Sequence, residues 1–249
     1  MNPHHQVQRW RGCREPGNVD PRARAHLPPF LEDTEANRRK RANFVYEICR
    51  ADTHLARMLG SLEAAGKLDN TLVVVTSDNG TAIPVDGVHR GKASPYDFGV
   101  HEPLAMMWPN RIKPGRTVTD FVSFADFAPT FLEAAGLEVP VSMTGRSLLP
   151  IIESEKSGRI EAQRDFIVTG LEWHGEFDPE SRSCRSIRDD RYAYVVRYAN
   201  VDQQGKPLDN EALIKPAKIE LYDLEKDPWQ MNDLANDPKV ADEKKRLAN

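Results

Sequence analysis

The segment Thr71-Leu72-Val73-Val74-Val75-Thr76-Ser77-Asp78-Asn79-Gly80 is the strongest structural signal in this chain. Its β-branched apolar run is typical of a buried strand in a parallel sheet, and a carboxylate and a carboxamide follow it directly. In open α/β sheets, ligands bind beyond the carboxyl ends of the strands. The sequence therefore places Asp78 and Asn79 where a cation or an anionic substrate would bind.

The elements around this strand favour an α/β domain. A long amphipathic helix is predicted to begin at Asp33 or Thr34, both good N-cap residues, and to end at Gly66. A helix that leads into a β-branched strand is the usual α/β pattern. Further along, residues 104–108 predict a second short buried strand, and residues 126–135 predict a helix.

The last third of the chain has a different pattern. Short strands are predicted at 166–168, 185–187, 192–198 and 219–222 without helices between them, which favours an antiparallel sheet. Residues 188–191 have the composition of a hairpin turn, and a helix is expected from about residue 236. We therefore predict two domains, an α/β core at 1–155 and a smaller α+β unit at 156–249.

Composition excludes several classes of function. With 249 residues, 39% of them hydrophobic, and a net charge of −4, the chain offers no global basis for binding nucleic acid. It contains no apolar run of the roughly eighteen residues that a membrane span needs. Its three widely spaced cysteines form no CxxC pair, so neither a zinc site nor a disulfide framework is expected.

Two segments contain the residues best suited to chemistry. Asp78 and Asn79 supply hard oxygen ligands, which suit Ca²⁺, or alternatively Mg²⁺. Lys92, in Gly91-Lys92-Ala93-Ser94-Pro95-Tyr96-Asp97, would neutralise charge on a bound sulfate or phosphate. The alternatives are that Asp-Asn-Gly is ordinary turn chemistry and that Lys92 is a solvated surface lysine.

The histidines leave their roles open. His4 would protonate a leaving group near neutral pH, or it belongs to an unstructured terminus. His174 has the same ambiguity, and His101, in His101-Glu102-Pro103, is either a substrate contact or the entry to a strand. The sequence contains no Gly-x-Ser-x-Gly elbow and no Walker loop, so no nucleophile stands out.

Several of these segments together resemble the C-terminal half of the formylglycine-dependent sulfatases. The resemblance extends over nearly the whole chain, and its closest subgroup is the heparan N-sulfatases, which cleave sulfamate from glucosamine. Its motifs are Thr76-Ser77-Asp78-Asn79-Gly80, the segment 91–97, Thr144-Gly145-Arg146-Ser147-Leu148-Leu149-Pro150, and Glu220-Leu221-Tyr222-Asp223-Leu224 with Asp227-Pro228. Glu102-Pro103 and the regions of Trp173-His174 and Arg185-Ser186 are similar to the N-sulfatase subgroup.

The resemblance implies an alkaline-phosphatase-like α/β core, here its C-terminal portion, with a smaller C-terminal antiparallel sheet. It also implies that Asp78 and Asn79 are Ca²⁺ ligands, that Lys92 contacts the sulfate, and that His4 binds sulfate or protonates the leaving group. The remaining site residues, expected to contact a sulfated saccharide or another small sulfate ester, are His101, His174 and Arg185. Intact members of this family are often secreted, periplasmic or lysosomal.

One departure from the family pattern bears on activity. The family nucleophile lies in Cys/Ser-x-Pro-x-Arg, and none of Cys13, Cys49 or Cys184 begins such a motif. We therefore expect the C-terminal part of a longer sulfatase that is inactive alone. The alternatives are a non-catalytic module that binds sulfated glycans and a phosphoester or phosphonate hydrolase of the same superfamily.

Overall fold

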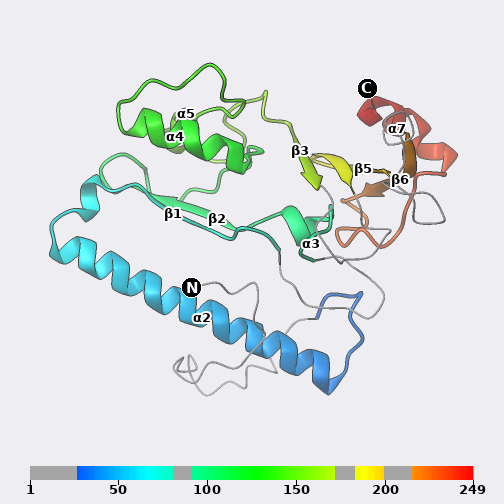
Figure 1. Ribbon diagram of the computed structural model, residues 1–249, viewed down its shortest axis with the longest axis horizontal. Helices are drawn as coiled ribbons and strands as arrows, with labels where there is room; N and C mark the ends of the chain where they lie inside the picture. Colours follow the sequence, from blue (N-terminus) through cyan, green and yellow to red (C-terminus); the bar gives the residue numbers. More distant parts are fainter. Residues whose placement is uncertain (1–26, 81–90, 172–182, 199–214, 249) are drawn as a thin grey trace, which may run out of the picture.

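The computed structural model describes residues 27–80, 91–171, 183–198 and 215–248, and Figure 1 shows their arrangement. A long helix lies apart from the rest, a two-stranded ribbon packs near two shorter helices, and a four-stranded sheet carries the C-terminal helix. The helices are α2 (Glu35–Ala64), α3 (Asp97–Val100), α4 (Phe127–Ala134), α5 (Leu149–Ile152) and α7 (Ala241–Ala248), and the 3-10 turns are η2 (Leu68–Asn70), η3 (Phe124–Asp126) and η5 (Pro238–Val240). The strands are β1 (Val73–Thr76), β2 (Leu104–Met107), β3 (Phe166–Leu171), β4 (Cys184–Asp189), β5 (Tyr192–Tyr198) and β6 (Pro216–Asp223).

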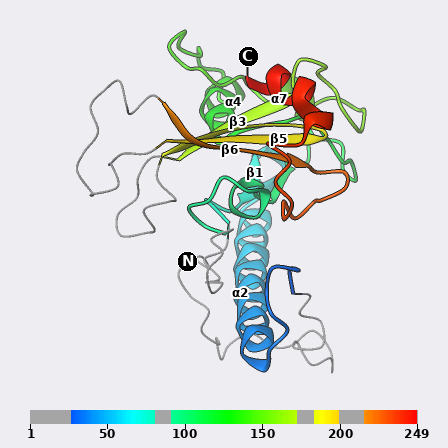
Figure 2. The ribbon, with the colours of Figure 1, turned by 90° about the vertical axis from the view of Figure 1, so that its right-hand side faces the viewer.

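Helix α2 confirms the predicted long helix and both of its ends. The Thr34 hydroxyl accepts a hydrogen bond from the Asn37 amide at 3.2 Å, which caps the first turn. Gly66 follows the last turn with φ +62°, a conformation that glycine adopts without strain. The helix projects from the rest of the fold like a stalk (Figure 2), and of its 30 residues only Ala42 and Glu47 are buried.

Strand β1 exists as predicted, but its pairing and burial differ from the prediction. It pairs antiparallel with β2, with Val73 opposite Met107 and Thr76 opposite Leu104, so the expected parallel pairing is wrong for the described residues. Val75 and Leu104 are exposed, whereas Trp108, the residue directly after β2, is buried. The apolar, β-branched composition of residues 71–76 indicates a strand, but it does not specify which strand will pair with it. In the structure that partner is β2.

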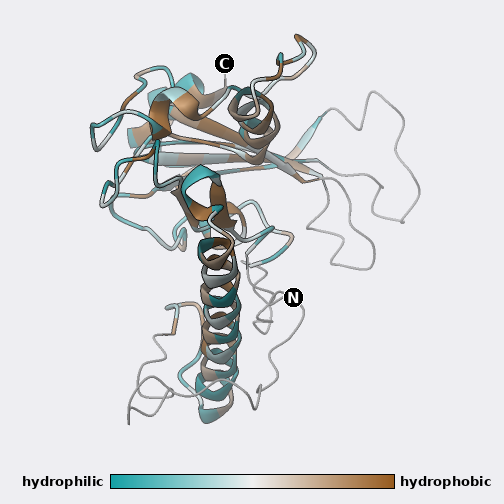
Figure 3. Cartoon of the chain, turned by 90° about the vertical axis from the view of Figure 1, so that its left-hand side faces the viewer, coloured by the Kyte–Doolittle hydropathy of each residue, from teal (hydrophilic) through white to brown (hydrophobic). Residues whose placement is uncertain are grey.

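A first hydrophobic core lies between the ribbon and helices α4 and α5. Trp108 packs there with Leu148, Leu149, Ile151 and Ile152. Helix α4 follows the prediction for residues 126–135 closely, with Pro129 in its first turn and Gly136 in the left-handed conformation just beyond its end. In the hydropathy colouring of Figure 3, much of this part of the molecule is brown, the colour of hydrophobic residues.

The C-terminal sheet has the predicted antiparallel topology, with the strand order β3-β4-β5-β6. The hairpin expected at 188–191 joins β4 to β5, where Asp189 accepts backbone hydrogen bonds from Arg191 and Tyr192. One face of the sheet packs against α7 through Tyr194, Leu221 and Leu247. Tyr96, from the loop that contains Lys92, packs together with Ala193 and Tyr222 in a separate cluster. The domain boundary near residue 155 stays a prediction.

Two further observations concern the cysteines and the helices. Cys49 of α2 is disulfide-bonded, which the spacing of the cysteines did not predict, whereas Cys184 is free and buried. Among the helices in the described ranges, none combines the length and the apolar character that a membrane crossing requires.

The motif at 144–150 is held in place by a buried ion pair. Arg164, which is 1% exposed, donates from Nη1 to Asp126 at 2.8 Å and from Nη2 to the carbonyls of Arg146 and Ser147 at 3.1 Å. Asp126 also accepts the amide of Arg146 at 2.7 Å. A Cβ on Gly145 would lie 1.9 Å from the Ala125 carbonyl oxygen, so the motif packs closely against the backbone at Ala125 and requires glycine at position 145.

We expect Arg164→Met to lower the free energy of unfolding by about 3–5 kcal/mol, because it leaves the buried Asp126 carboxylate without its cation. Urea unfolding followed by near-UV circular dichroism measures this change. The control is Arg38→Met, which breaks an exposed pair with Asp33 and should leave the free energy essentially unchanged. Equal effects of the two substitutions would contradict the assignment of Arg164 as a buried structural charge.

Candidate functional site

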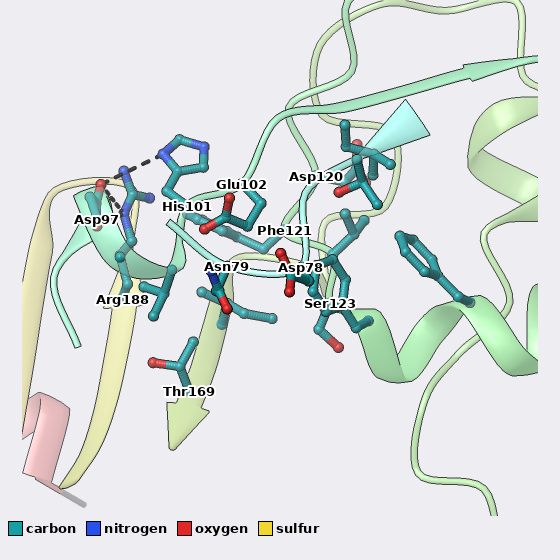
Figure 4. Close-up of a pocket in the computed structure, with 18 of the residues that line it drawn as sticks. Asp78, Asn79, Asp97, His101, Glu102, Asp120, Phe121, Ser123, Thr169 and Arg188 are labelled. Carbon is teal, nitrogen blue, oxygen red and sulfur yellow. Dashed lines mark hydrogen bonds and ion pairs between the residues drawn. The ribbon is translucent and has the colours of Figure 1, made fainter. Parts of the chain in front are cut away.

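The site begins where β1 ends, in the turn Ser77-Asp78-Asn79-Gly80. The Ser77 hydroxyl donates to the Asn79 carbonyl at 3.0 Å, and the Asn79 side-chain amide donates to the Gly80 carbonyl at 3.0 Å. These short-range bonds fix the turn beyond the strand. Asp78 and Asn79 both line a cavity of about 900 Å³, shown in Figure 4.

Two glycines bring this turn against the segment that follows Lys92. The Gly80 amide donates to the Gly99 carbonyl at 3.0 Å. A Cβ on Gly80 would lie 2.1 Å from the Phe98 carbonyl oxygen, and a Cβ on Gly99 would lie 2.4 Å from that of Gly91. Only residues without side chains allow backbones to approach this closely. The contact joins the end of β1 to the segment 91–99, and Lys92 lines the same cavity.

The C-terminal sheet holds the lysine-containing loop through Tyr96. The Tyr96 hydroxyl donates to Glu220 at 2.8 Å and accepts from Arg197 at 2.9 Å, and the side chain of Glu220 is fully buried. Burial alone would raise the pKa of Glu220, but the hydrogen bonds and charge of Arg197, with two tyrosine hydroxyls, outweigh it and hold the pKa at about 2. The loop is therefore fixed to β5 and β6 by an ionised, fully hydrogen-bonded carboxylate.

A second anchor acts one residue later, at Asp97. Its backbone amide donates to Gln230 at 2.7 Å, and its carboxylate accepts from Arg188 Nε at 3.0 and 3.1 Å. Figure 4 shows this pair at the rim of the cavity beside His101. His101 is largely exposed, with Nδ1 3.7 Å from Asp97 Oδ2, and it lines the cavity, while its contact with substrate stays a prediction.

Glu102 also belongs to the site. In the sequence it is notable only because Glu102-Pro103 is similar to the N-sulfatases. Its Oε1 is buried and has no hydrogen-bond partner among the described residues. Burial, and then the neighbouring charge of Asp78, raise the pKa of Glu102 to about 7 against the opposing effects of His101 and Ser77. No sequence signal pairs Glu102 with Asp78, because the two residues meet only through the fold.

The oxygen atoms at this end of the cavity suit a hard divalent cation. Asp78, Asn79 and Glu102 offer oxygen ligands, and an unpartnered carboxylate oxygen beside a second carboxylate is the environment that Ca²⁺ or Mg²⁺ neutralises. Within the described ranges, no group of three or more His, Cys, Asp or Glu side chains is arranged to hold a metal. The residues therefore fit as part of a ligand set.

The remaining predicted site residues fall outside this arrangement. Arg185 is exposed on β4, alternates with the cavity-lining Cys184 and Ser186, and donates to the Cys184 carbonyl at 2.9 Å. In the part of the chain that the structure describes, Arg185 is not among the residues that line the cavity. His4 and His174 lie outside the described residues, so their roles stay predictions.

Sequence and structure comparisons identify similar proteins. The family model described as sulfatase matches residues 11–137, and the model described as N-sulphoglucosamine sulphohydrolase, C-terminal, matches residues 91–249. The Homo sapiens N-sulphoglucosamine sulphohydrolase is 29% identical over 252 residues, covering 86% of this chain and 47% of that protein. The chain spans less than half the length of these curated relatives. It covers 44% and 41% of two ulvan-active sulfatases of Formosa agariphila, and 47% of the human protein.

Solved structures agree with these matches. A protein in complex with its substrate D-glucosamine-2-N,6-O-disulfate aligns with a TM-score of 0.67 at 29% identity, covering 85% of this chain and 39% of that one. The phosphonate monoester hydrolase of Silicibacter pomeroyi aligns with a TM-score of 0.67 at 26% identity, covering 92% and 44%. The predicted α/β fold of the alkaline-phosphatase-like type, and the resemblance to sulfatases, are confirmed.

We expect Gly99→Ala to lower the free energy of unfolding by about 1–3 kcal/mol, because the added methyl group would meet the Gly91 carbonyl and force the backbones apart. Gly60→Ala on α2 is the matched control, since a Cβ there meets no atom within 4 Å, and it should stabilise the helix slightly. Urea unfolding followed by near-UV circular dichroism measures both. If Gly99→Ala behaved like Gly60→Ala, the close contact would be refuted.

Glu102 gives the metal-free protein a pH dependence of stability. Its pKa is about 7 in the folded state against an ordinary value of 4.5, so the folded state holds an extra proton between these values. Stability should therefore fall as the pH rises from about 4.5 through 7, and Glu102→Gln should remove that component. Unfolding free energies measured with a chelator at pH 5 and pH 8 test this. A constant difference between the two proteins across the range would contradict the raised pKa.

Proposed function

The chain belongs to the sulfatase family, and on that premise we propose that it forms part of a hydrolase that acts on sulfate esters or sulfamates of sugars. The proposal rests mainly on one observation, that Asp78, Asn79 and Lys92 line a single cavity although Lys92 is not adjacent to the other two in the sequence. Oxygen ligands for a cation on one side and an ammonium group on the other suit a bound tetrahedral oxyanion.

Each of these residues has a distinct task in the proposed site. Asp78 and Asn79 would hold the cation, with Ca²⁺ as the first choice and Mg²⁺ as the alternative, and Glu102 lies beside them. When bound, the cation supplies positive charge that stabilises negative charge growing on the sulfuryl oxygens. Lys92 would bind the sulfate from the loop that Tyr96 and Asp97 anchor, so its approach is set by the C-terminal sheet.

The size of the cavity supports a saccharide substrate. A volume of about 900 Å³ exceeds what a sulfate alone needs and falls in the usual range for a small organic ligand. Beyond the cation-binding residues, the walls include the exposed Phe124 and the polar side chain of Arg188, which offer apolar and polar contacts to a sugar. The bound disulfated glucosamine of one neighbour is consistent with this class of ligand.

We further infer that this chain needs a nucleophile from outside its 249 residues, because the sequence contains no Cys/Ser-x-Pro-x-Arg motif. The alternative of a non-catalytic module would keep the basic contacts and bind sulfated glycans without a cation. A second candidate activity is phosphonate monoester hydrolysis, favoured by the likeness to the Silicibacter pomeroyi enzyme, since a phosphonate monoester is also a tetrahedral oxyanion.

Calorimetry with D-glucosamine-2-N,6-O-disulfate tests the proposed function. We expect binding that requires Ca²⁺, and we expect Lys92→Ala to weaken it by about tenfold or more, as the loss of a charged hydrogen-bond donor predicts. Asp78→Asn should weaken Ca²⁺ binding measured on its own. Lys239→Ala, in the 3-10 turn η5, is the control and should bind as the unmodified chain does.

Two results would contradict the proposal. Saccharide binding that is indifferent to Ca²⁺ would favour the non-catalytic module, and tighter binding of a phosphonate monoester than of the sulfated sugar would favour the second candidate activity. Steady release of sulfate by the purified chain would refute the inference that its nucleophile lies elsewhere.

A further inference from the structure

The hydroxyl of Ser94 is buried in the cavity wall without a partner. Ser94 is 4% exposed, lines the cavity beside Lys92, and its Oγ has no hydrogen-bond partner among the described residues. A buried hydroxyl that loses its hydrogen bonds to water and gains none in the fold destabilises the protein. Such a group calls for a physical explanation.

A comparison with Ser186 shows that this fold satisfies a buried serine where the hydroxyl is structural. Ser186 is 7% exposed, lines the same cavity, and its hydroxyl lies 2.7 Å from that of Thr169. The two serines thus share residue type, burial and cavity. They differ in that the Ser186 hydroxyl is paired within the sheet, whereas the Ser94 hydroxyl has no hydrogen-bond partner among the described residues.

The backbone around Ser94 is held firmly. Ala93, between Lys92 and Ser94, has φ +63°, a left-handed conformation that residues other than glycine seldom adopt. Ser94 also packs against Gly99, since a Cβ there would lie 2.6 Å from Ser94 Oγ. Because the anchors at Tyr96 and Asp97 follow directly, the backbone at Ser94 is held in place beside the cavity.

We propose that the Ser94 hydroxyl donates a hydrogen bond to the oxyanion that Lys92 binds, making Ser94 a second anion-binding residue of the same loop. This inference rests on the proposed function, because the oxyanion is the sulfuryl group of the substrate. A hydroxyl can donate one hydrogen bond to such an oxygen while the ammonium group supplies the charge. No covalent step is required of Ser94.

Ser94→Ala tests the inference, because it removes the hydroxyl and creates no clash. Without ligand, its urea unfolding midpoint should equal or exceed that of the unmodified chain, since an unpaired buried polar group is lost. Its affinity for D-glucosamine-2-N,6-O-disulfate with Ca²⁺ should fall by about 10- to 100-fold, as for a lost hydrogen bond to a charged group. Ser186→Ala, the matched control for stability, should lower the unfolding midpoint.

The outcomes separate this inference from the proposed function. If Lys92→Ala abolished binding and Ser94→Ala bound normally, the role of Ser94 would be refuted and the proposed function would stand. If neither substitution changed binding, both would fall. If Ser94→Ala lowered the unliganded midpoint as Ser186→Ala does, the hydroxyl would be structural and the inference would be wrong.

Discussion

The buried carboxylate of Glu220 is the interaction on which the geometry of this molecule depends. It accepts from Arg197 within the sheet, and from Tyr96 and Tyr222, so one side chain ties β5 and β6 to the loop that contains Lys92. A charge in a low-dielectric interior is tolerated only when every partner is in place, which makes such a network exacting about geometry. The position of Lys92 is therefore set by sheet residues that lie more than a hundred positions later in the sequence.

Much of the fold could be predicted from local sequence signals. The cap at Thr34, the left-handed glycines at 66 and 136 and the hairpin at Asp189 each depend on the chemistry of a few neighbouring residues, and each appears where expected. The pairing of β1 could not be predicted in the same way, because an apolar β-branched run specifies a strand without naming its partner. Pairing is a property of the whole chain, and here β2 supplies it.

The candidate site shows the same division. Asp78, Asn79 and Lys92 follow strands and glycines in recognisable patterns, and they do share a cavity. The involvement of Glu102 and Ser94 is visible only in three dimensions, because it depends on burial and on which hydrogen bonds are missing. The sequence also could not show which arginine of β4 lines the cavity. The register of β4 decides this, and it places Arg188 rather than Arg185 at the cavity.

The sparse burial of α2 among the described residues has a consequence for how the molecule melts. Within the described residues, this helix of 30 residues has two buried positions and exposes Val45, Ile48 and Met58, so it buries less apolar surface than the sheet does. Its hydrogen bonds are therefore expected to open at lower temperature than those of the tyrosine-rich sheet, as a separate cooperative unit. Far-ultraviolet circular dichroism would then report mainly the unfolding of α2, whereas near-ultraviolet circular dichroism would report the unfolding of the tyrosine-rich sheet. Heating would therefore give two transitions in place of one.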